Sequence, residues 1–201
     1  MIILKNEQYY FWNKKSVSPW VKYDEEMNIK FSYVNKILFE NINIKKNQSV
    51  LDVGCGSGFT SYRSSKKVGV NGNVTAVDIS KPLLRLFKEK YDNIENLSCI
   101  RKDLQKTSLK NNIFDHVISR FGIMFFEYPL EAFKNIYQSL KKSGSLTFVC
   151  WTNFKYNQFF AMPAYSVSKK IKIAIPKISN KPGPFAFKDK SYIQKLLKHL
   201  H

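Results

Sequence analysis

Acidic residues, cysteine and long apolar runs are all scarce in this chain. Its 201 residues include 15 Asp and Glu against 33 Lys and Arg, and only three cysteines. Cys55, Cys99 and Cys150 lie far apart and lack the close spacing of metal ligands, so we expect buried free thiols and no metal site. No apolar run has the length of a membrane span, and no charged-then-apolar leader begins the chain. These absences predict a cytoplasmic protein without a membrane span.

The excess of positive charge raises the hypothesis of a nucleic-acid partner, because basic residues neutralise phosphates. The net charge is +18, but only four of the 33 basic residues are arginine, which leaves 29 lysines. These lysines are dispersed along a chain rich in asparagine and isoleucine, a pattern that A+T-rich coding would produce. Nucleic-acid recognition favours arginine interleaved with aromatic residues, so the pattern indicates a solvated surface instead. An RNA acceptor stays open as an alternative.

Three glycines at alternate positions follow a short apolar run in the segment VLDVGCGSG, residues 50–58. The run Ser49–Val53 is apolar and β-branched, which is typical of a strand buried on both faces, and a helix is expected from Phe59. Glycines have no Cβ, so the backbone can adopt positive φ and approach a ligand closely. The helix that follows points its free N–H groups at the same place. The pattern predicts a nucleotide-type ligand at this turn.

Further strands alternate with helices along the chain. Val74–Asp78 ends in an acid 20 residues after Gly58, the separation at which a carboxylate accepts hydrogen bonds from a ribose. A helix is expected over Leu130–Lys142, and the three other strands are expected at Leu97–Arg101, Phe114–Ser119 and Ser145–Trp151. This order predicts a single α/β domain over residues 1–201. Its sheet should be doubly wound and mainly parallel, with ligands at the C-terminal ends of the strands.

The glycine spacing distinguishes two families that use this architecture. Dinucleotide oxidoreductases need GxGxxG, whereas this chain has GxGxG preceded by Asp52, an acid that would repel a pyrophosphate but suits a cationic ligand. S-adenosylmethionine carries an ammonium and a sulfonium and has no phosphate. With Asp78, Asp103 and Phe114–Phe121, the chain resembles the class I S-adenosylmethionine-dependent methyltransferases, most closely the ubiquinone and menaquinone C-methyltransferases. The resemblance extends from about Trp12 to the last residue.

The resemblance implies which residues hold the methionine part of S-adenosylmethionine. Gly54, Gly56 and Gly58 would pass beneath it, and Cys55 lies among them in the turn. Asp52 would lie near the ammonium, either directly or through water. The main chain at Arg120 would close the pocket near the methionine. Glycine turns after strands are common in α/β proteins, so a structural role for this turn is the alternative.

The adenosine part has its own implied residues. Asp78 would accept hydrogen bonds from both ribose hydroxyls, and Ile79 would pack on the adenine face. Asp103 would accept from the adenine amino group, and Leu104 would line the ring. Acids after strands often cap helices, which is the alternative for both carboxylates.

Segments on either side of the cofactor-binding core, residues 46–151, are expected to shape the acceptor site. Residues 1–45 hold an aromatic cluster and a helix from Asp24; the resemblance implies that they cover the cofactor, and simple packing on the sheet is the alternative. Residues 152–187 are basic and rich in proline, which predicts neither a core strand nor a long helix. The resemblance implies that they fold over the active site, with a surface loop as the alternative. Asp189 is expected to cap a final helix within 188–201.

The resembling family continues after this last helix with two more strands, and we expect this chain to lack that hairpin. Ser145–Trp151 would then be an exposed apolar edge that could pair with a second chain. The implied reaction is an in-line methyl transfer to a small or medium-sized acceptor, which depends mostly on alignment, so no catalytic residue is named. His116 is interpreted as a histidine of the fourth strand. A truncated, non-catalytic cofactor-binding module is the alternative function.

Overall fold

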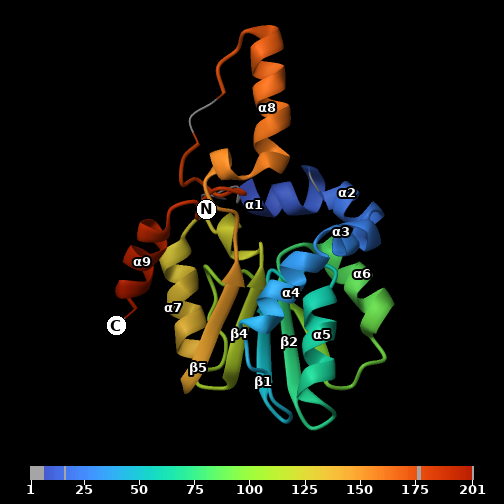
Figure 1. The fold of residues 1–201 in the computed structure, drawn as a ribbon. Coiled ribbons are helices and arrows are strands. Elements are labelled where there is room, and N and C mark those ends of the chain that lie inside the picture. Colours follow the sequence, from blue (N-terminus) through green and yellow to red (C-terminus); the bar gives the residue numbers. More distant parts are fainter. Residues whose placement is uncertain (1–6, 16, 176–177, 201) are drawn as a thin grey trace, which may run out of the picture.

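A computed structural model describes residues 7–15, 17–175 and 178–200. Its centre is one sheet of five parallel strands in the order β3-β2-β1-β4-β5 (Figure 1). The strands are β1 (Ser49–Val53), β2 (Asn73–Asp78), β3 (Leu97–Arg101), β4 (Phe114–Arg120) and β5 (Leu140–Val149). The chain runs outward from β1 to one edge and then returns to the other. The prediction of a doubly wound α/β fold is confirmed.

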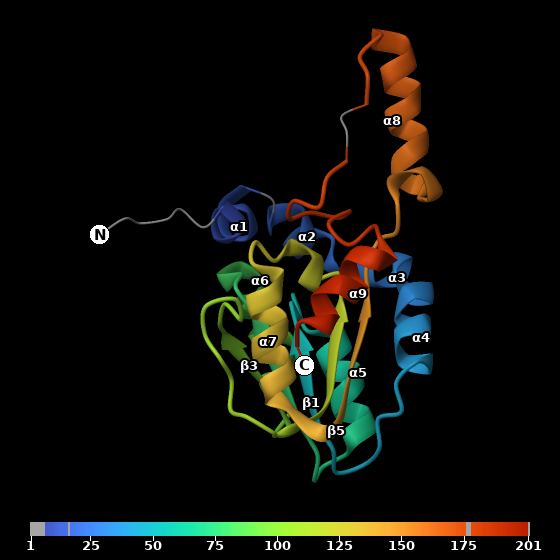
Figure 2. The same ribbon diagram turned by 90° about the vertical axis from the view of Figure 1, so that its left-hand side faces the viewer.

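Helices cover both faces of the sheet, because side chains alternate between two cores along each strand. On one face, Val50 packs with residues of α4 (Ser32–Glu40), α5 (Phe59–Val68) and α6 (Lys81–Tyr91). On the other face, Leu51 and Val53 pack with residues of α7 (Pro129–Ser139) and α9 (Lys190–Lys198). Figure 2 shows α7 and α9 on their side of the sheet. Because both faces of the sheet are buried at its three central strands, β1, β2 and β4 read as largely apolar runs.

The end of α7 differs from the sequence-based expectation. The helix ends at Ser139, and β5 begins at once with Leu140, which pairs with Phe114. The register then shifts between Phe114 and His116, and Gly144 lies at this irregularity. A Cβ on Gly144 would lie 2.9 Å from the carbonyl oxygen of Phe114. Ser143-Gly144, taken as a helix stop, is therefore part of an irregular strand, which a glycine permits.

The N-terminal elements lie above the C-terminal ends of the strands (Figure 1). They are α1 (Glu7–Tyr10), a π-helical turn (Phe11–Lys15), α2 (Val17–Lys22) and α3 (Asp24–Lys30), and α4 then follows along one face of the sheet. The single helix expected from Asp24 is divided at Phe31, so α3 and α4 point in different directions. Phe31 packs against Phe121 and Trp151 at the top of the sheet, with ring centroids 5.3 and 6.3 Å apart. The bend therefore lets one helical segment reach over the strand ends.

The region after β5 contains a short turn (Phe154–Tyr156) and α8 (Gln158–Ile171), which projects from the domain (Figures 1 and 2). The prediction that this segment forms no long helix is wrong. Pro163 lies inside α8 and removes one intrahelical hydrogen bond, but the residues around it continue the helix. Within the described part of the chain, no helix has both the length and the apolar character needed to cross a membrane.

The edge of the sheet at β5 has no further strand beside it among the described residues. Leu146, Phe148 and Val149 are partly buried and pack against the core that α7 and α9 cover. The strand ends at Val149, two residues earlier than expected, and Trp151 turns into the region above the sheet. Asp189 occupies the N-cap position of α9 as expected, but its side chain makes no capping hydrogen bond and pairs with Lys188 at 3.0 Å instead.

Candidate cofactor-binding site

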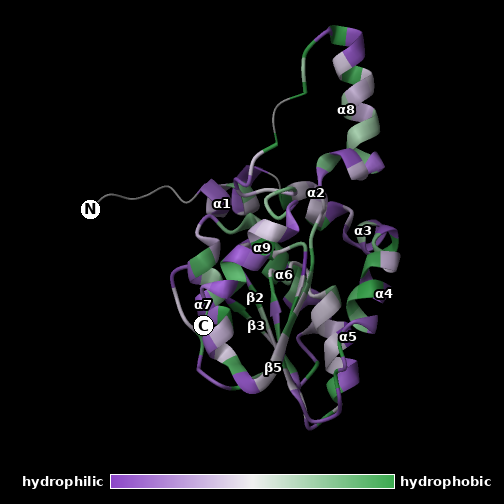
Figure 3. Ribbon diagram, turned by 60° about the vertical axis from the view of Figure 1, so that its left-hand side comes forward, coloured by the Kyte–Doolittle hydropathy of each residue, from purple (hydrophilic) through white to green (hydrophobic). Residues whose placement is uncertain are grey.

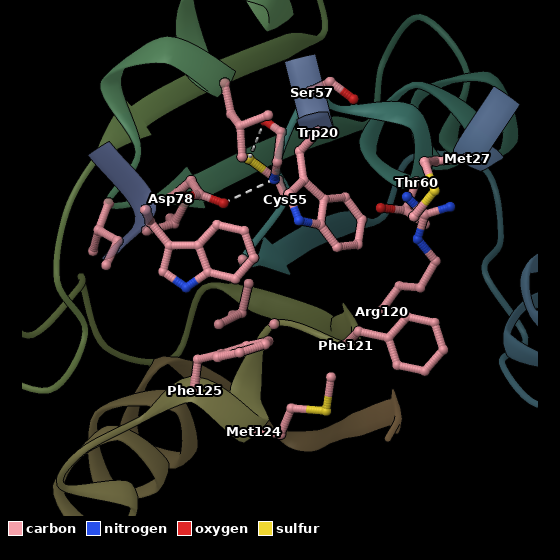
Figure 4. A pocket seen from close by; sticks show the side chains of 18 of the residues that line it. Trp20, Met27, Cys55, Ser57, Thr60, Asp78, Arg120, Phe121, Met124 and Phe125 are labelled. Atoms are coloured by element: carbon pink, nitrogen blue, oxygen red, sulfur yellow. Dashed lines mark hydrogen bonds between the residues drawn. The ribbon is translucent and has the colours of Figure 1, made fainter. Parts of the chain in front are cut away.

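A cavity of about 340 Å³ lies at the C-terminal ends of β1, β2 and β4. The glycine turn, the β2 and β3 ends and the segment after β4 form its floor, and Trp12, Trp20 and Phe31 cover it from the N-terminal side. Phe160 and Pro184 close it from the C-terminal side. Figure 4 shows side chains from these elements converging on one space. This is where parallel α/β sheets bind their ligands.

The glycine turn has the geometry of a ligand cradle. A Cβ on Gly54 would lie 2.6 Å from the Cα of Gly122, so glycine is needed there for the β1 and β4 ends to approach. Gly56 has φ +58°, and a Cβ on it would meet no protein atom closer than Leu83 Cδ1 at 4.0 Å. Its N–H donates to Asp78 Oδ2 at 2.8 Å. The Gly56 backbone therefore faces open space and is tied to the acid at the end of β2.

Asp78 presents an oriented carboxylate to the cavity (Figure 4). Its Oδ2 accepts from Gly56 N and its Oδ1 accepts from Ser80 N at 2.8 Å. Burial raises the pKa of this carboxyl, and the hydrogen bonds from Ser80, Gly56 and Ile79 N–H groups oppose that rise. Each carboxylate oxygen has a second lone pair, so both can still accept from ligand hydroxyls.

The other end of the cavity is formed by residues that follow β2 and β3. Ile79, Asp103 and Leu104 line it, and their contacts with adenine stay predictions. Asp103 Oδ1 accepts from the backbone and side-chain nitrogens of Gln105 at 3.1 and 3.0 Å, which fixes the carboxylate. Leu104 is buried, and its carbonyl accepts from Asn135 Nδ2 at 2.7 Å. An apolar wall beside an acceptor group suits a flat heterocycle with an amino group.

Asp52 and Gly58 do not reach the cavity wall. Asp52 is fully buried beneath it, and its Oδ2 accepts from the Thr60 and Ser61 hydroxyls, both at 2.6 Å. Its Oδ1 has no hydrogen-bond partner among the described residues. Burial raises the pKa of Asp52, and the two hydroxyls and the Arg120 charge oppose that rise. Thr60 does line the cavity, so Asp52 orients a cavity-lining hydroxyl by accepting its hydrogen bond. The contact of Asp52 with an ammonium stays a prediction.

Gly58 has a packing function in this structure. It begins α5 in a left-handed conformation, and a Cβ on it would lie 2.2 Å from Phe87 Cδ2 on α6. The third glycine of the motif therefore lets the α5 start pack closely against α6. Gly58 does not line the cavity, and its place beneath the methionine part of a ligand stays a prediction.

Arg120 contributes its side chain to the site, whereas the sequence indicated only its main chain. The Nη1 group donates to Asn28 Oδ1 and Asn35 Oδ1, both at 2.9 Å, and the guanidinium lies over the Phe59 ring. Burial lowers its pKa, and the charges of Asp52 and Asp24 oppose that change. The α3 and α4 helices thus hold a partly buried cation at the cavity wall.

Asp24 is a site residue that the sequence analysis used only as a helix start. Its Oδ1 accepts from the Ser57 hydroxyl in the glycine turn, and its Oδ2 pairs with Lys90 Nζ of α6 at 2.6 Å. All three side chains come together where α3 crosses the turn. The run Asp24-Glu25-Glu26 is a dense acidic cluster in an acid-poor chain, which was the available signal. Asp24 therefore fastens the N-terminal cover to the glycine turn.

Aromatic rings form the rest of the wall. Trp12 meets Phe125 edge-on with centroids 4.9 Å apart, and its carbonyl accepts from the Ser80 hydroxyl at 2.8 Å. Phe121 and Trp151 stack with centroids 4.7 Å apart and planes 8° apart. The N-terminal aromatic residues therefore cover the cavity in addition to packing on the domain. Flat acceptors and cationic sulfur both suit such a wall.

The remaining residues singled out in the sequence have other surroundings. His116 contacts Ser145 Oγ and Gln48 Oε1 at 2.9 and 3.0 Å, away from the cavity. The three cysteines are free thiols. Cys55 is buried at the cavity floor, and burial holds its pKa well above the usual thiol value. Burial also raises the pKa of Cys150 to about 11.

Comparisons with known proteins agree with this geometry. Residues 51–148 match the family described as "Methyltransferase domain". A demethylmenaquinone methyltransferase of Staphylococcus aureus is 32% identical over 127 residues, which are 61% of this chain and 53% of that protein. The chain thus spans about half the length of the curated relatives that it matches.

Solved structures share the fold at low sequence identity. An S-adenosylmethionine-dependent methyltransferase from Aquifex aeolicus has a TM-score of 0.60 and 20% identity, with 83% of this chain and 78% of that chain covered. A Haemonchus contortus phosphoethanolamine N-methyltransferase, in complex with S-adenosyl-L-methionine, has a TM-score of 0.61 and 19% identity over 84% of this chain and 36% of that one. Sheet order, glycine turn and sequence match agree: residues 51–148 are similar to the methyltransferase domain family, on a fold that S-adenosylmethionine-dependent methyltransferases share.

Proposed function

We propose that this chain transfers a methyl group from S-adenosylmethionine to a small, apolar, aromatic acceptor. One observation carries the proposal: a polar floor built from Gly56, Asp78 and Asp103 meets an aromatic wall within a single cavity. The polar floor suits a nucleoside and the aromatic wall suits a flat acceptor. Binding both in one space supplies the alignment on which a displacement reaction depends.

The residues present fit S-adenosylmethionine. The open space above Gly56 allows close approach of a ligand to the backbone, and Asp78 offers oriented acceptors for ribose hydroxyls. Asp103 and Leu104 offer an acceptor and an apolar face for adenine. When bound, S-adenosylmethionine supplies a methyl group on a sulfonium, which an acceptor nucleophile takes up with loss of a proton.

The remaining task of the protein is to position the acceptor and to exclude water. Trp12, Trp20 and Phe31 cover the cavity, so water is displaced from the space between the two ligands. The Arg120 guanidinium is held by two amide oxygens, which suits it to an anionic oxygen on the acceptor. The relative from S. aureus is named for demethylmenaquinone. A demethylated quinone is therefore the acceptor class that we propose first.

Turnover with defined acceptors tests the proposal. The chain would be incubated with S-adenosylmethionine and a demethylated quinone, a fatty acid or an RNA, and S-adenosylhomocysteine would be measured by mass spectrometry. We expect product with the quinone, and much less product from the Asp78→Ala variant at the same S-adenosylmethionine concentration. Cofactor binding without turnover on any acceptor would favour a non-catalytic module. Turnover on RNA alone would contradict the small-molecule acceptor.

A further inference from the structure

The α8 helix and the segment after it, residues 158–175, form a projection that carries both apolar and basic side chains. The packed contacts of this projection lie in its lower half: Ala161 is buried, Phe160 meets Trp151 and Phe185 edge-on with centroids 5.2 Å apart, and Tyr165 meets Phe154 edge-on with centroids 6.0 Å apart. The rest of the helix extends away from the domain in both views (Figures 1 and 2). The projection therefore has a surface that the domain itself does not cover.

Large apolar side chains lie open along this projection. Met162, Tyr165, Val167, Ile171 and Ile173 are each between 51% and 62% exposed. The Ser168 hydroxyl donates to the Ile173 carbonyl at 2.6 Å, which folds the chain back at the tip and keeps the two isoleucines there. Figure 3 shows hydrophobic colouring along α8 and the segment after it. Exposed apolar residues gathered in this way mark an interaction surface.

The charge around this surface has a single sign. Residues 158–175 contain three lysines and no Asp, Glu or Arg. Lys169, Lys170 and Lys172 lie at the tip, next to the exposed isoleucines. A surface that combines aliphatic side chains with lysine is complementary to an anionic lipid interface.

We propose that residues 158–175 dock the protein on an anionic phospholipid bilayer. A helix of 14 residues is about 21 Å long, which is shorter than the roughly 30 Å of a hydrocarbon core, so α8 would enter the interface without crossing it. Ile171 and Ile173 would reach the acyl region, while the lysines would stay among the headgroups. Tyr165 suits the boundary between them.

Two other partners fit the same surface less well. A second copy of this chain would bring two lysine-rich tips together, and their charges would repel. An RNA would meet aliphatic side chains without arginine, and these provide neither stacking nor bidentate phosphate contacts. The lipid surface alone uses both the apolar side chains and the lysines.

The projection stands at the mouth of the cavity, because Phe159 and Phe160 at the start of α8 line that cavity. Lys30 Nζ lies 4.2 Å from the centroid of the Phe159 ring, so the base of α8 contacts the N-terminal cover. An acceptor dissolved in the bilayer would then enter beside the base of α8. This statement about entry rests on the proposed function, whereas docking itself does not.

Co-sedimentation with phospholipid vesicles tests the docking. Vesicles of phosphatidylglycerol and phosphatidylcholine in equal amounts would be compared with phosphatidylcholine alone. We expect the unchanged protein to bind the anionic vesicles. The triple variant Lys169→Gln/Lys170→Gln/Lys172→Gln should bind them about 100-fold more weakly, because each lysine contributes roughly a factor of five. The double variant Ile171→Ser/Ile173→Ser should bind them at least tenfold more weakly.

Matched controls remove the same groups from the opposite end of the domain. Lys45→Gln/Lys46→Gln/Lys142→Gln changes three exposed lysines, and Val70→Ser changes an apolar side chain that is 91% exposed. Both should bind vesicles far more tightly than the tip variants. Equal loss in the controls would mean a nonspecific charge effect and would overturn the proposal, as would no binding by the unchanged protein.

Three further measurements distinguish a lipid surface from a second copy, an RNA and a misfolded tip. A dimer in light scattering that the isoleucine variant abolishes would indicate a second copy as the partner. An RNA complex that resists salt would indicate a nucleic-acid surface. Either result without vesicle binding overturns the proposal. Calorimetry with S-adenosylmethionine should give the same affinity for the tip variants as for the unchanged protein. If a tip variant lost both its affinity for S-adenosylmethionine and its vesicle binding, that variant would be misfolded. The double variant Met162→Ser/Val167→Ser would then be tested in its place. Failure of methyl transfer with intact vesicle binding would count against the proposed function alone.

Discussion

Replacing Gly56 by alanine should separate ligand binding from folding. Gly56 has φ +58°, and its absent Cβ points to space in which Leu83 Cδ1, 4.0 Å away, is the nearest protein atom. An alanine would therefore meet no steric clash inside the protein and would suffer only the backbone cost of a left-handed residue. That cost is about 1–2 kcal/mol. For a domain of this size it lowers Tm by about 2–8 °C.

The same methyl group would occupy the space where a ligand meets the turn, so we expect Gly56→Ala to bind S-adenosylmethionine at least tenfold more weakly. Differential scanning fluorimetry without ligand would measure the stability change. Titration calorimetry would then measure the affinity at a temperature well below the Tm of the variant.

Gly69→Ala is the matched control. Gly69 has φ +71° and ψ −178° at the end of α5, and a Cβ on it would meet no atom closer than Lys46 Cγ at 3.9 Å. Its strain costs about 1–3 kcal/mol, at least as much as at Gly56, but it lies outside the cavity wall. We expect a lowered Tm and unchanged affinity. The reasoning would be refuted if Gly56→Ala bound S-adenosylmethionine as tightly as the unchanged protein, or if Gly69→Ala lost affinity to the same degree.

Five other outcomes follow from the structure. Asp78→Ala should weaken S-adenosylmethionine binding by about 1.5–3 kcal/mol by calorimetry, since a charged acceptor is lost. In the unchanged protein, burial raises the pKa of Asp78, so this carboxylate takes up a proton at a pH that is still above 3.8, the ordinary aspartate value. The affinity for S-adenosylmethionine should therefore already fall as the pH is lowered toward 3.8, and a flat profile would contradict this. Gly58→Ala should unfold at a markedly lower temperature than Gly56→Ala, because its Cβ would overlap the Phe87 ring, and equal Tm values would contradict that. RNA binding in a filter assay should be weak and lost at modest salt, and a salt-resistant, sequence-selective complex would count against it. The edge of β5 should support concentration-dependent association by light scattering, with slowed amide exchange over 145–149 on association.

The sheet and its ligand end could be predicted from local signals. Ser49–Val53 and Leu97–Arg101 are strands with the expected limits. Ser49–Val53 is buried on both faces and reads as an apolar run between polar turns, whereas Leu97–Arg101 is an edge strand that is largely exposed. The glycines and the acids after the strands also act locally, and the right-handed connection of parallel strands then brings Gly56, Asp78 and Asp103 to the same edge of the sheet. Asp189 at the start of α9 is a similar local signal.

Contacts between distant residues could not be predicted in this way. Ser143-Gly144 reads as a helix stop in isolation, and only pairing of Leu140 with Phe114 makes it part of β5. Pro163 reads as a helix breaker, but the loss of one hydrogen bond leaves a 14-residue helix in place.

The sequence by itself determined a doubly wound α/β domain with a glycine turn and two strand-end acids, because these depend on residues close together in the chain. The tertiary structure alone decided that Asp24 fastens α3 to Ser57, that Arg120 places a partly buried guanidinium between Asn28 and Asn35, and that Asp52 and Gly58 lie behind the cavity wall. It also placed α8 as a projection beside the cavity mouth. The physical reason is that burial, ion pairing and side-chain direction depend on packing between segments that folding brings together, and no local pattern encodes them.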